Sequence, residues 1–358
     1  MATRTAGQAG QTQPLYLYSE IPIRLPATMF PEPGAVDCDD NGFLYFRVND
    51  GGENPLGVRI AEVSPTGYAA QTFSLSNVPD LELRATARGS DFGVTGAGAL
   101  DLLTRAAEPL GPRLDVIEFA ANGRYQATVK LSQFFVPRGF ALLPGGGFFV
   151  FALARDPWAV MESSKSGKPA PYTEPIGAFF DSHGQLRREI NLPGAAVAPP
   201  GSGTSPGGGG AAPGTTAPAL VAADYDGTVY VAREDPPLSV YVISDTGTTV
   251  DSIKLQPPVP QARLAAITPA GPERLAVEFQ AGAEGTEPSA MENAFSIVNT
   301  MTGDRVADYR ASTATGGKLG CYARNGFELL ARDASGKPAL RFVTGNPPPP
   351  VAASQDPR

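Results

Sequence analysis

Residues 220–234 read LVAADYDGTVYVARE, and residues 239–255 read SVYVISDTGTTVDSIKL. The first stretch is an apolar run, an Asp-Gly turn and an alternating run, a pattern typical of a β-hairpin. The second stretch repeats this plan around Asp245-Thr246-Gly247. Together they predict four short strands joined by tight turns, which would form one antiparallel sheet.

Copies of this four-strand unit recur along the chain. An apolar strand leads into a Gly-containing turn five times, and glycine supplies the positive φ that such turns require. A further strand follows each turn, and four of these strands share an apolar-polar-leucine ending. They are 73–75 (FSL), 129–131 (VKL), 190–192 (INL) and 253–255 (IKL).

The two ends of the chain complete each other. Residues 21–25 (IPIRL) have the ending of a fourth strand with no three strands before them, whereas 318–343 has three strands and no fourth. We therefore predict an all-β, six-bladed β-propeller of four-stranded antiparallel blades, closed by the N-terminal strand pairing with the last blade. The expected blades are 34–75, 80–131, 138–192, 219–255, 262–310, and 318–343 with 14–25.

Segments outside the repeats are polar or of low complexity. The propeller is expected over 14–345, with residues 1–13 as a disordered N-terminal tail. Residues 193–218 are rich in Gly and Pro and have little to bury, so they predict a disordered insert. Residues 346–358 contain four consecutive prolines and predict an extended, disordered tail.

Composition narrows the classes of partner and compartment. The net charge of −8 and the lack of a basic run argue against nucleic acid or an anionic membrane surface. No apolar stretch is long enough to span a bilayer. The polar start lacks the apolar core of a signal peptide and would suit a chain whose signal has been removed, so we expect a secreted, periplasmic or cell-surface protein, with a cytoplasmic one as the alternative.

The lengths of the expected connections distinguish the two faces of the ring. The connections between second and third strands, and the links between blades, lie on one face, which we call the loop face. The turns between first and second and between third and fourth strands lie on the other, the turn face. All long connections belong to the loop face, which predicts binding there through residues of 154–175. The candidates are Trp158, the only Trp, with Tyr172, Arg155 and Asp156.

An acidic pattern suggests a cation site. Residues 37–42 (DCDDNG) match the first half of a calcium loop, although Val48 stands where its bidentate Glu belongs. The candidate ligands for Ca²⁺ or another divalent cation are Asp37, Asp39, Asn41 and Asp224. The other interpretation, which we favour, is that Asp and Asn before Gly are simply good turn residues.

The sequence contains few residues of the types that common catalytic sites require. His183 is the only histidine and falls in a predicted tight turn, so a Ser-His-Asp triad or a multi-histidine metal site has little to draw on. Residues 203–207 (GTSPG) match the G-x-S-x-G pattern but lie in the Gly/Pro-rich insert rather than between a strand and a helix.

The two cysteines fall in the first strands of blades 1 and 6, which become neighbours when the ring closes. A disulfide between Cys38 and Cys321 would suit an exported protein. The alternative is two small buried hydrophobic residues, because inner strands of adjacent blades often diverge beyond the ~7 Å Cα limit of a bridge.

Residues 220–234 and 239–247 resemble the NHL-type repeat of six-bladed propellers: a strand ending in Asp, an Asp-Gly turn, a Tyr-Val strand, then an apolar strand and a second Gly turn. Residues 34–48 and 58–75 match it again, with Asn41-Gly42 as the first turn. Blades 2, 3 and 5 depart from the pattern at that turn. The resemblance implies a binding scaffold more often than an enzyme, and it implies no particular ligand.

These observations predict a non-catalytic scaffold that binds a protein or glycan partner through its loop face. A metal-dependent, lactonase-like hydrolase with a divalent cation in the central channel is the first alternative. A structural subunit of a surface assembly is the second.

Overall fold

The chain is described by a computed structural model. The described residues are 3–5, 12–49, 59–79, 91–108, 111–133, 137–152, 175–192, 220–233, 238–281, 292–312 and 314–346.

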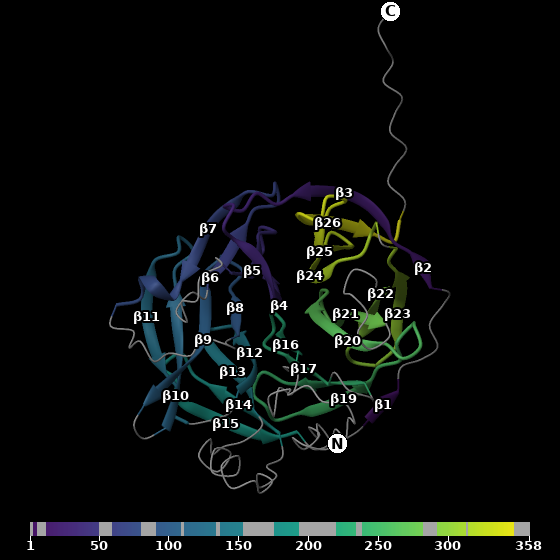
Figure 1. Cartoon of the computed structure of the whole chain (residues 1–358). Coiled ribbons are helices and arrows are strands. Elements are labelled where there is room, and N and C mark those ends of the chain that lie inside the picture. Colours follow the sequence, from purple (N-terminus) through teal and green to yellow (C-terminus); the bar gives the residue numbers. More distant parts are fainter. Residues whose placement is uncertain are drawn as a thin grey trace, which may run out of the picture.

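Six sheets, each built on four antiparallel strands, surround a common axis in this part of the chain (Figure 1). The first strand of each sheet lies innermost. Blade 1 is β4 (Phe30–Cys38), β5 (Leu44–Asn49), β6 (Arg59–Val63) and β7 (Ala69–Ser74), followed by the short helix η1 (Leu75–Asn77). Blade 2 is β8 (Phe92–Val94), β9 (Leu100–Glu108), β10 (Gly111–Phe119) and β11 (Tyr125–Lys130). Blade 3 is β12 (Pro137–Leu143), β13 (Gly147–Ala152), β14 (Ile176–Phe180) and β15 (Leu186–Asn191).

The second half of the ring follows the same plan, except that its last sheet takes its outer strand from the N-terminal segment. Blade 4 is β16 (Leu220–Ala223), β17 (Val229–Arg233), β18 (Ser239–Ile243) and β19 (Val250–Lys254). Blade 5 is β20 (Arg263–Pro269), β21 (Arg274–Ala281), β22 (Glu292–Asn299) and β23 (Arg305–Arg310). Blade 6 is β24 (Lys318–Ala323), β25 (Gly326–Arg332), β26 (Pro338–Thr344) and β3 (Tyr16–Pro22). The predicted six-bladed β-propeller is confirmed.

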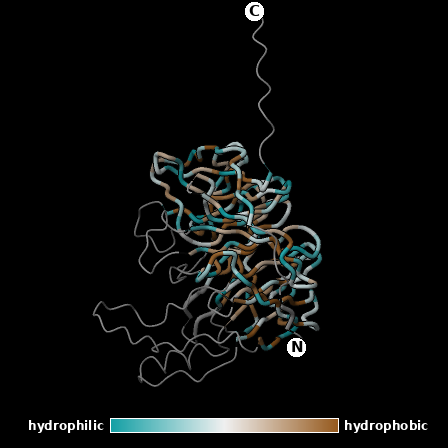
Figure 2. The backbone as a smooth tube through the Cα atoms, turned by 90° about the vertical axis from the view of Figure 1, so that its right-hand side faces the viewer, coloured by the Kyte–Doolittle hydropathy of each residue, from teal (hydrophilic) through white to brown (hydrophobic). Residues whose placement is uncertain are grey.

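The hydrophobic core is divided among the seams between blades, and each seam has its own cluster of buried side chains. Strand β13 shows how one strand serves two seams: Phe148 and Val150 pack toward blade 2, while Phe149 and Phe151 pack toward blade 4. Because both faces of such a strand are buried, its sequence is apolar throughout instead of alternating. In the side view, hydrophobic stretches run through the interior of the ring (Figure 2).

The N-terminal strand closes the ring as predicted. Strand β3 pairs antiparallel with β26, with Pro22 opposite Ala339 and Tyr16 opposite Thr344. Just beyond β3, the N–H of Ile23 donates to the carbonyl of Pro338 at 2.9 Å. Pairing of the first and last segments removes the open sheet edge that β26 would otherwise present.

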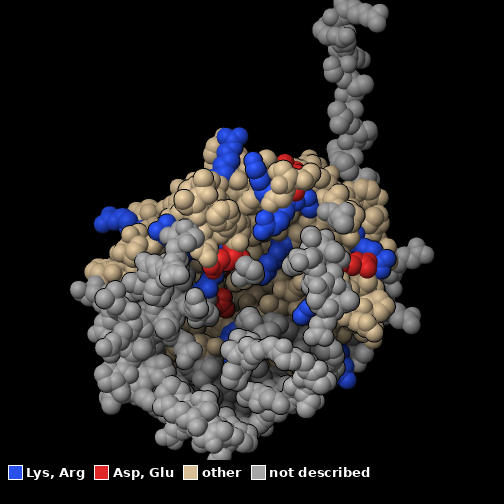
Figure 3. Space-filling view, viewed as in Figure 1, with Lys and Arg blue, Asp and Glu red and all other residues tan. Residues whose placement is uncertain are grey.

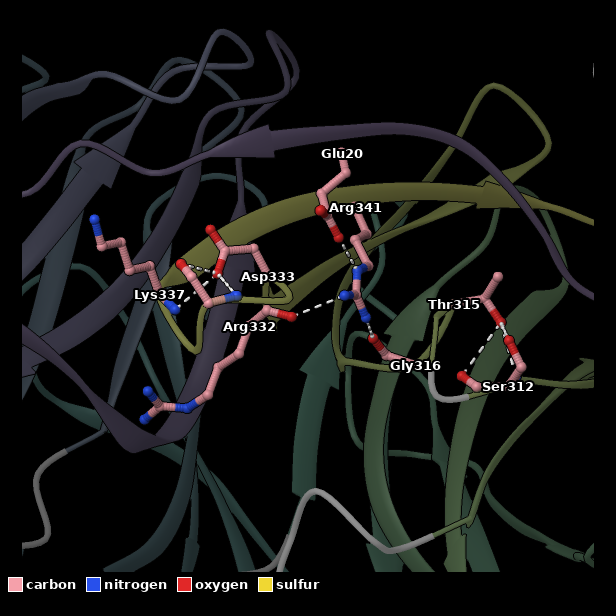
Figure 4. A network of polar contacts seen from close by, with 9 residues as sticks. Glu20, Ser312, Thr315, Gly316, Arg332, Asp333, Lys337 and Arg341 are labelled. Atoms are coloured by element: carbon pink, nitrogen blue, oxygen red, sulfur yellow. Dashed lines mark hydrogen bonds and ion pairs between the residues drawn. The ribbon is translucent and has the colours of Figure 1, made fainter.

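A partly buried ion pair joins the two strands of this closure (Figure 4). The guanidinium of Arg341, on β26, donates from Nε to a carboxylate oxygen of Glu20, on β3, at 2.6 Å. Its other nitrogens donate to the carbonyls of Gly316 and Arg332 at 2.7 and 2.8 Å. Arg341 is only 7% exposed, so these bonds are needed to offset the desolvation of its charge.

Two short strands lie in or next to the predicted tail 1–13, most of which is outside the described residues. Strand β1 (Thr3–Thr5) pairs in parallel with β19, and β2 (Gln13–Pro14) pairs in parallel with β23. The N-terminal segment thus follows the outer rims of blades 4, 5 and 6 in turn (Figure 1). Such pairing uses backbone groups at sheet edges, so hydrophobic patterning did not indicate it.

A disulfide joins the inner strands of blades 6 and 1. Cys38 on β4 and Cys321 on β24 are bonded, with their Cα atoms 6.0 Å apart. The two strands approach closely beside Gly320, where a Cβ would lie 3.0 Å from Cγ1 of Val36. Because glycine has no side chain there, the Cα atoms stay within the ~7 Å limit that seemed to disfavour a bridge.

None of the helices in the described ranges has the length and apolar character that a membrane crossing requires.

A glycine in the closing seam offers a test of how tightly it is packed. Gly67 has φ +83°, and a Cβ there would meet the carbonyl oxygen of Pro22 and lie 2.8 Å from Ile21, both on β3. Gly336 has a similar φ of +80°, but a Cβ there would have no atom within 4 Å, so Gly336 is the control. Replacing either by Ala incurs positive-φ strain of about 1–2 kcal/mol. We expect Gly67→Ala to lower the free energy of unfolding by a further ~1–3 kcal/mol because it also pushes β3 away. Urea unfolding measures this, and equal losses in both variants would contradict it.

Candidate functional site

The lengths of the connections differ between the two faces, as the sequence predicted. On the turn face, connections between strands are short throughout, for example 39–43 between β4 and β5 and 181–185 between β14 and β15. The long connections, such as 50–58, 153–175, 192–219 and 282–291, all join strands at the loop face. The predicted binding residues Trp158, Tyr172, Arg155 and Asp156 lie outside the described residues.

The acidic residues of the first turns act as turn acceptors. Oδ1 of Asp39 accepts the backbone N–H groups of Asn41 and Phe43, both at 2.9 Å. Asp224 holds the same place in blade 4 and accepts the N–H of Tyr225 at 2.7 Å. These are the side chain-to-backbone bonds by which Asp stabilises tight turns. The turn interpretation therefore accounts for both aspartates.

The predicted metal ligands are engaged elsewhere. Asp37 accepts the N–H of Cys38 on one carboxylate oxygen and that of Val94 on the other, at 2.8 and 3.0 Å, and Asn41 serves as a backbone donor to Asp39. Among the described residues, no three His, Cys, Asp or Glu side chains come together as ligands. The cation site at Asp37, Asp39, Asn41 and Asp224 therefore stays a prediction.

Three carboxylates bridge adjacent blades. Asp37 of blade 1 accepts the N–H of Val94 on β8, and Asp91 of blade 2 accepts the N–H of Phe140 on β12 at 3.0 Å. In the same way, Glu278 on β21 accepts the N–H of Leu319 on β24 at 2.8 Å. These three bonds cross the seams between blades 1 and 2, blades 2 and 3, and blades 5 and 6. In each case the donor lies on an inner strand, whose channel-side edge has no partner strand. A carboxylate from the preceding blade supplies the missing acceptor.

Two basic side chains join this network. The ammonium of Lys318, on β24, donates to the carbonyl of Gly34 on β4, so blade 6 also supports the inner edge of blade 1. The positive charges of Arg47 and Lys318 both act on Asp91, and Lys318 acts on Glu278 as well. Figure 3 shows Lys and Arg side chains gathering around the hollow at the centre of the ring, with Asp and Glu beside them.

Burial shifts the protonation of these carboxyl groups. Desolvation raises the pKa of Asp37 to about 6, and the nearby charges of Asp91 and Asp39 add to the shift. Desolvation also raises the pKa of Asp91 to about 6, although the N–H bonds and the two basic side chains oppose it. Glu278, fully buried, has a raised pKa for the same reason. The inner wall therefore holds carboxyl groups that gain protons at mildly acidic pH.

A tyrosine crosses the ring at the turn face. The hydroxyl of Tyr225, in the first turn of blade 4, donates to Oδ1 of Asp40, in the first turn of blade 1, at 2.9 Å. These blades stand opposite each other in the ring of six. Burial and the charges of Asp40 and Asp224 raise the pKa of Tyr225, which keeps its hydroxyl protonated and able to donate. The bond therefore links two opposite blades at the turn face.

The only histidine takes no part in these clusters. His183 is exposed in the turn between β14 and β15, where its backbone N–H donates to Asp181 at 3.0 Å. Sequence reasoning missed the bridging roles of Asp91 and Glu278, Arg47, Lys318 and Tyr225. The available signal was a charged residue within or next to an apolar strand, as at Glu278 in RLAVEFQA and Asp91 before FGV.

No family model matches the sequence, and no curated protein matches it. The NHL-type assignment therefore remains a prediction. Three solved structures are similar in fold. A protein of unknown function from Bacteroides caccae has a TM-score of 0.46 at 10% identity, over 80% of this chain and 83% of that chain.

The second is a protein of unknown function from Dyadobacter fermentans DSM 18053, with a TM-score of 0.48 at 11% identity, over 92% of this chain and 99% of that chain. The third is BBS1N in complex with ARL6DN, soaked with lead, with a TM-score of 0.44 at 14% identity, over 96% of this chain and 99% of that chain. Similarities of this size concern the fold alone.

The raised pKa of Asp91 predicts a pH dependence of stability. The folded protein holds this proton up to about pH 6, whereas the unfolded chain releases it near 4. The contribution of Asp91 to the free energy of unfolding therefore falls as pH rises from about 4 to 6, and it does not change further above pH 6. Relative to Asp91→Asn, we expect the natural protein to gain stability as pH falls from 7 to 5, by less than about 1.4 kcal/mol per pH unit.

Urea unfolding at the two pH values measures this gain. Asp181→Asn is the matched control, because the N–H bonds of Gln185 and His183 lower the pKa of Asp181. Its difference from the natural protein should stay constant between pH 5 and 7. A constant difference for Asp91→Asn as well would show that this carboxyl is not desolvated in the folded protein.

Proposed function

We propose that the protein is a non-catalytic binding scaffold that engages a protein or glycan partner through its loop face. The observation that carries this proposal is the distribution of connections, since the long ones are all on that face and the turn face consists of tight turns. Rigid strands that hold variable loops at one end of a ring are a common platform for recognition. The hydrogen bond from Tyr225 to Asp40 adds to the asymmetry, because it links two opposite blades at the turn face.

The chemistry of the channel also supports a binding role rather than catalysis. Asp37, Asp91 and Glu278 each accept backbone N–H groups of a neighbouring blade, so their oxygens serve the architecture. A general base needs a free acceptor within reach of a substrate proton. The hydrolase alternative would need acidic groups that face the channel and are not used in these bonds.

Export is part of the proposal. The disulfide between Cys38 and Cys321 supports it, because such bonds persist mainly outside the reducing cytosol. The likeness of residues 220–247 to NHL-type repeats agrees with a scaffold whose ligand is set by its loops.

Replacing 155–174 by a short Gly-Ser linker tests the proposed site. We expect the variant to lose binding to a glycan array and to extracellular proteins of the source organism. Its melting temperature should change by less than about 2 °C, because the described apolar clusters of blade 3 are built from residues outside 155–174. The matched control is Met301→Ser in a turn-face loop, where Met301 is 51% exposed.

The control should bind as the natural protein does. If the linker variant keeps every interaction of the natural protein, or if Met301→Ser is the variant that loses them, the assignment of the site to the loop face is wrong.

A further inference from the structure

Besides the apolar seam and the bond from Lys318 to Gly34, two contacts that use different atoms close the ring at blade 6. On the outside of blade 6, β3 is held to β26 by backbone hydrogen bonds over Tyr16–Pro22. On the inside, the bond between Cys38 and Cys321 joins blade 1 to blade 6. The first closure is non-covalent and depends on the N-terminal segment, whereas the second is covalent and does not.

The covalent loop closed by the disulfide leaves β3 outside. The bonded cysteines are 283 positions apart, and the chain between them contains β5 to β23, from blade 1 to blade 5. Strand β3 precedes Cys38, and β25 and β26 follow Cys321. Removing β3 from its place would therefore leave a circle of chain that is still joined from blade 1 to blade 6.

Strand β3 is held mainly by its backbone. Its side chains are mostly exposed, including Tyr16, Leu17 and Tyr18 at 36%, 36% and 58%. Within the strand, only Ile21 packs against the seam between blades 6 and 1; the flanking residues Leu15, Ile23 and Leu25 also pack in the seams. A strand with so little buried apolar surface has a lower free energy of opening than the seams themselves.

We propose that the disulfide makes β3 a detachable strand. While the disulfide is intact, β3 can leave blade 6 and the ring stays closed. When the disulfide is reduced, closure of the ring depends on β3. Reduction by a dithiol transfers two electrons and two protons to the Sγ–Sγ bond, which gives two cysteine thiols and the oxidised, cyclic form of the reductant. Detachment exposes the free edge of β26, including Arg341 and Phe342, which then lose their contacts with Glu20 and Tyr18.

Native-state hydrogen exchange of the full chain tests the proposal. The probes are the backbone amides of β26 and β3, compared with those between β14 and β15, where the outer strand of blade 3 is continuous with its own blade. In the oxidised protein we expect the β3–β26 amides to exchange on the order of 100-fold faster than the control amides, through local opening. After reduction with dithiothreitol, the two sets should exchange at rates within about tenfold of each other, because opening of β3 then opens the ring.

Two results would overturn the proposal. One is an oxidised protein whose β3–β26 amides exchange as slowly as the control amides, since β3 would then be integral to the fold. The other is a reduced protein in which the difference persists, since the ring would then survive without either closure.

A second measurement does not require a folded reduced protein. A chain that begins at residue 27, prepared with its disulfide formed, should unfold cooperatively and retain the seams of blades 1 to 5. It should also bind a synthetic peptide of residues 14–25, which restores the fourth strand of blade 6. An unfolded truncated chain with an intact disulfide would contradict the proposal directly.

Discussion

Closure of the ring between blades 6 and 1 is the constraint on which the rest of the structure depends. Each seam buries its own cluster of apolar side chains, and the sixth seam forms only when the ends of the ring meet. An open ring would expose that cluster together with two sheet edges, which is unfavourable in water and invites association with other chains. The pairing of β3 with β26 and the Cys38–Cys321 bond both act at this one place.

The central channel poses a second problem, because each inner strand is an edge strand. Charged side chains bond to these free edges. The carboxylates of Asp37, Asp91 and Glu278 accept N–H groups of the next blade, and the ammonium of Lys318 donates to a carbonyl of the next blade. Each bridge replaces bonds to water by charge-assisted bonds across a seam. Charged groups in the interior thus have an architectural role.

The sequence predicted the blades more completely than it predicted their contacts. Alternation, Gly turns and the recurring strand endings placed each sheet close to its observed bounds, as in blade 4, expected over 219–255 and formed by β16 to β19. The candidate site was predicted less completely than the blades. The residues chosen for the loop face lie outside the described part of the chain, and the acidic pattern at 37–42 holds a turn and a neighbouring strand. The disulfide stayed an open alternative because its geometry depends on the close approach at Gly320.

The sequence by itself determined the number of blades, the tight turns of one face, the long connections of the other and the strand that closes the ring. Each of these follows from residues that are neighbours along the chain, where a two-residue period and a Gly turn have a direct structural meaning. Only the tertiary structure decided which polar groups meet between blades: Asp91 with Phe140, Glu278 with Leu319, and Tyr225 with Asp40 across the ring. Those pairs depend on how closely neighbouring blades approach and how they are rotated about the axis, and no local pattern of residues encodes either quantity.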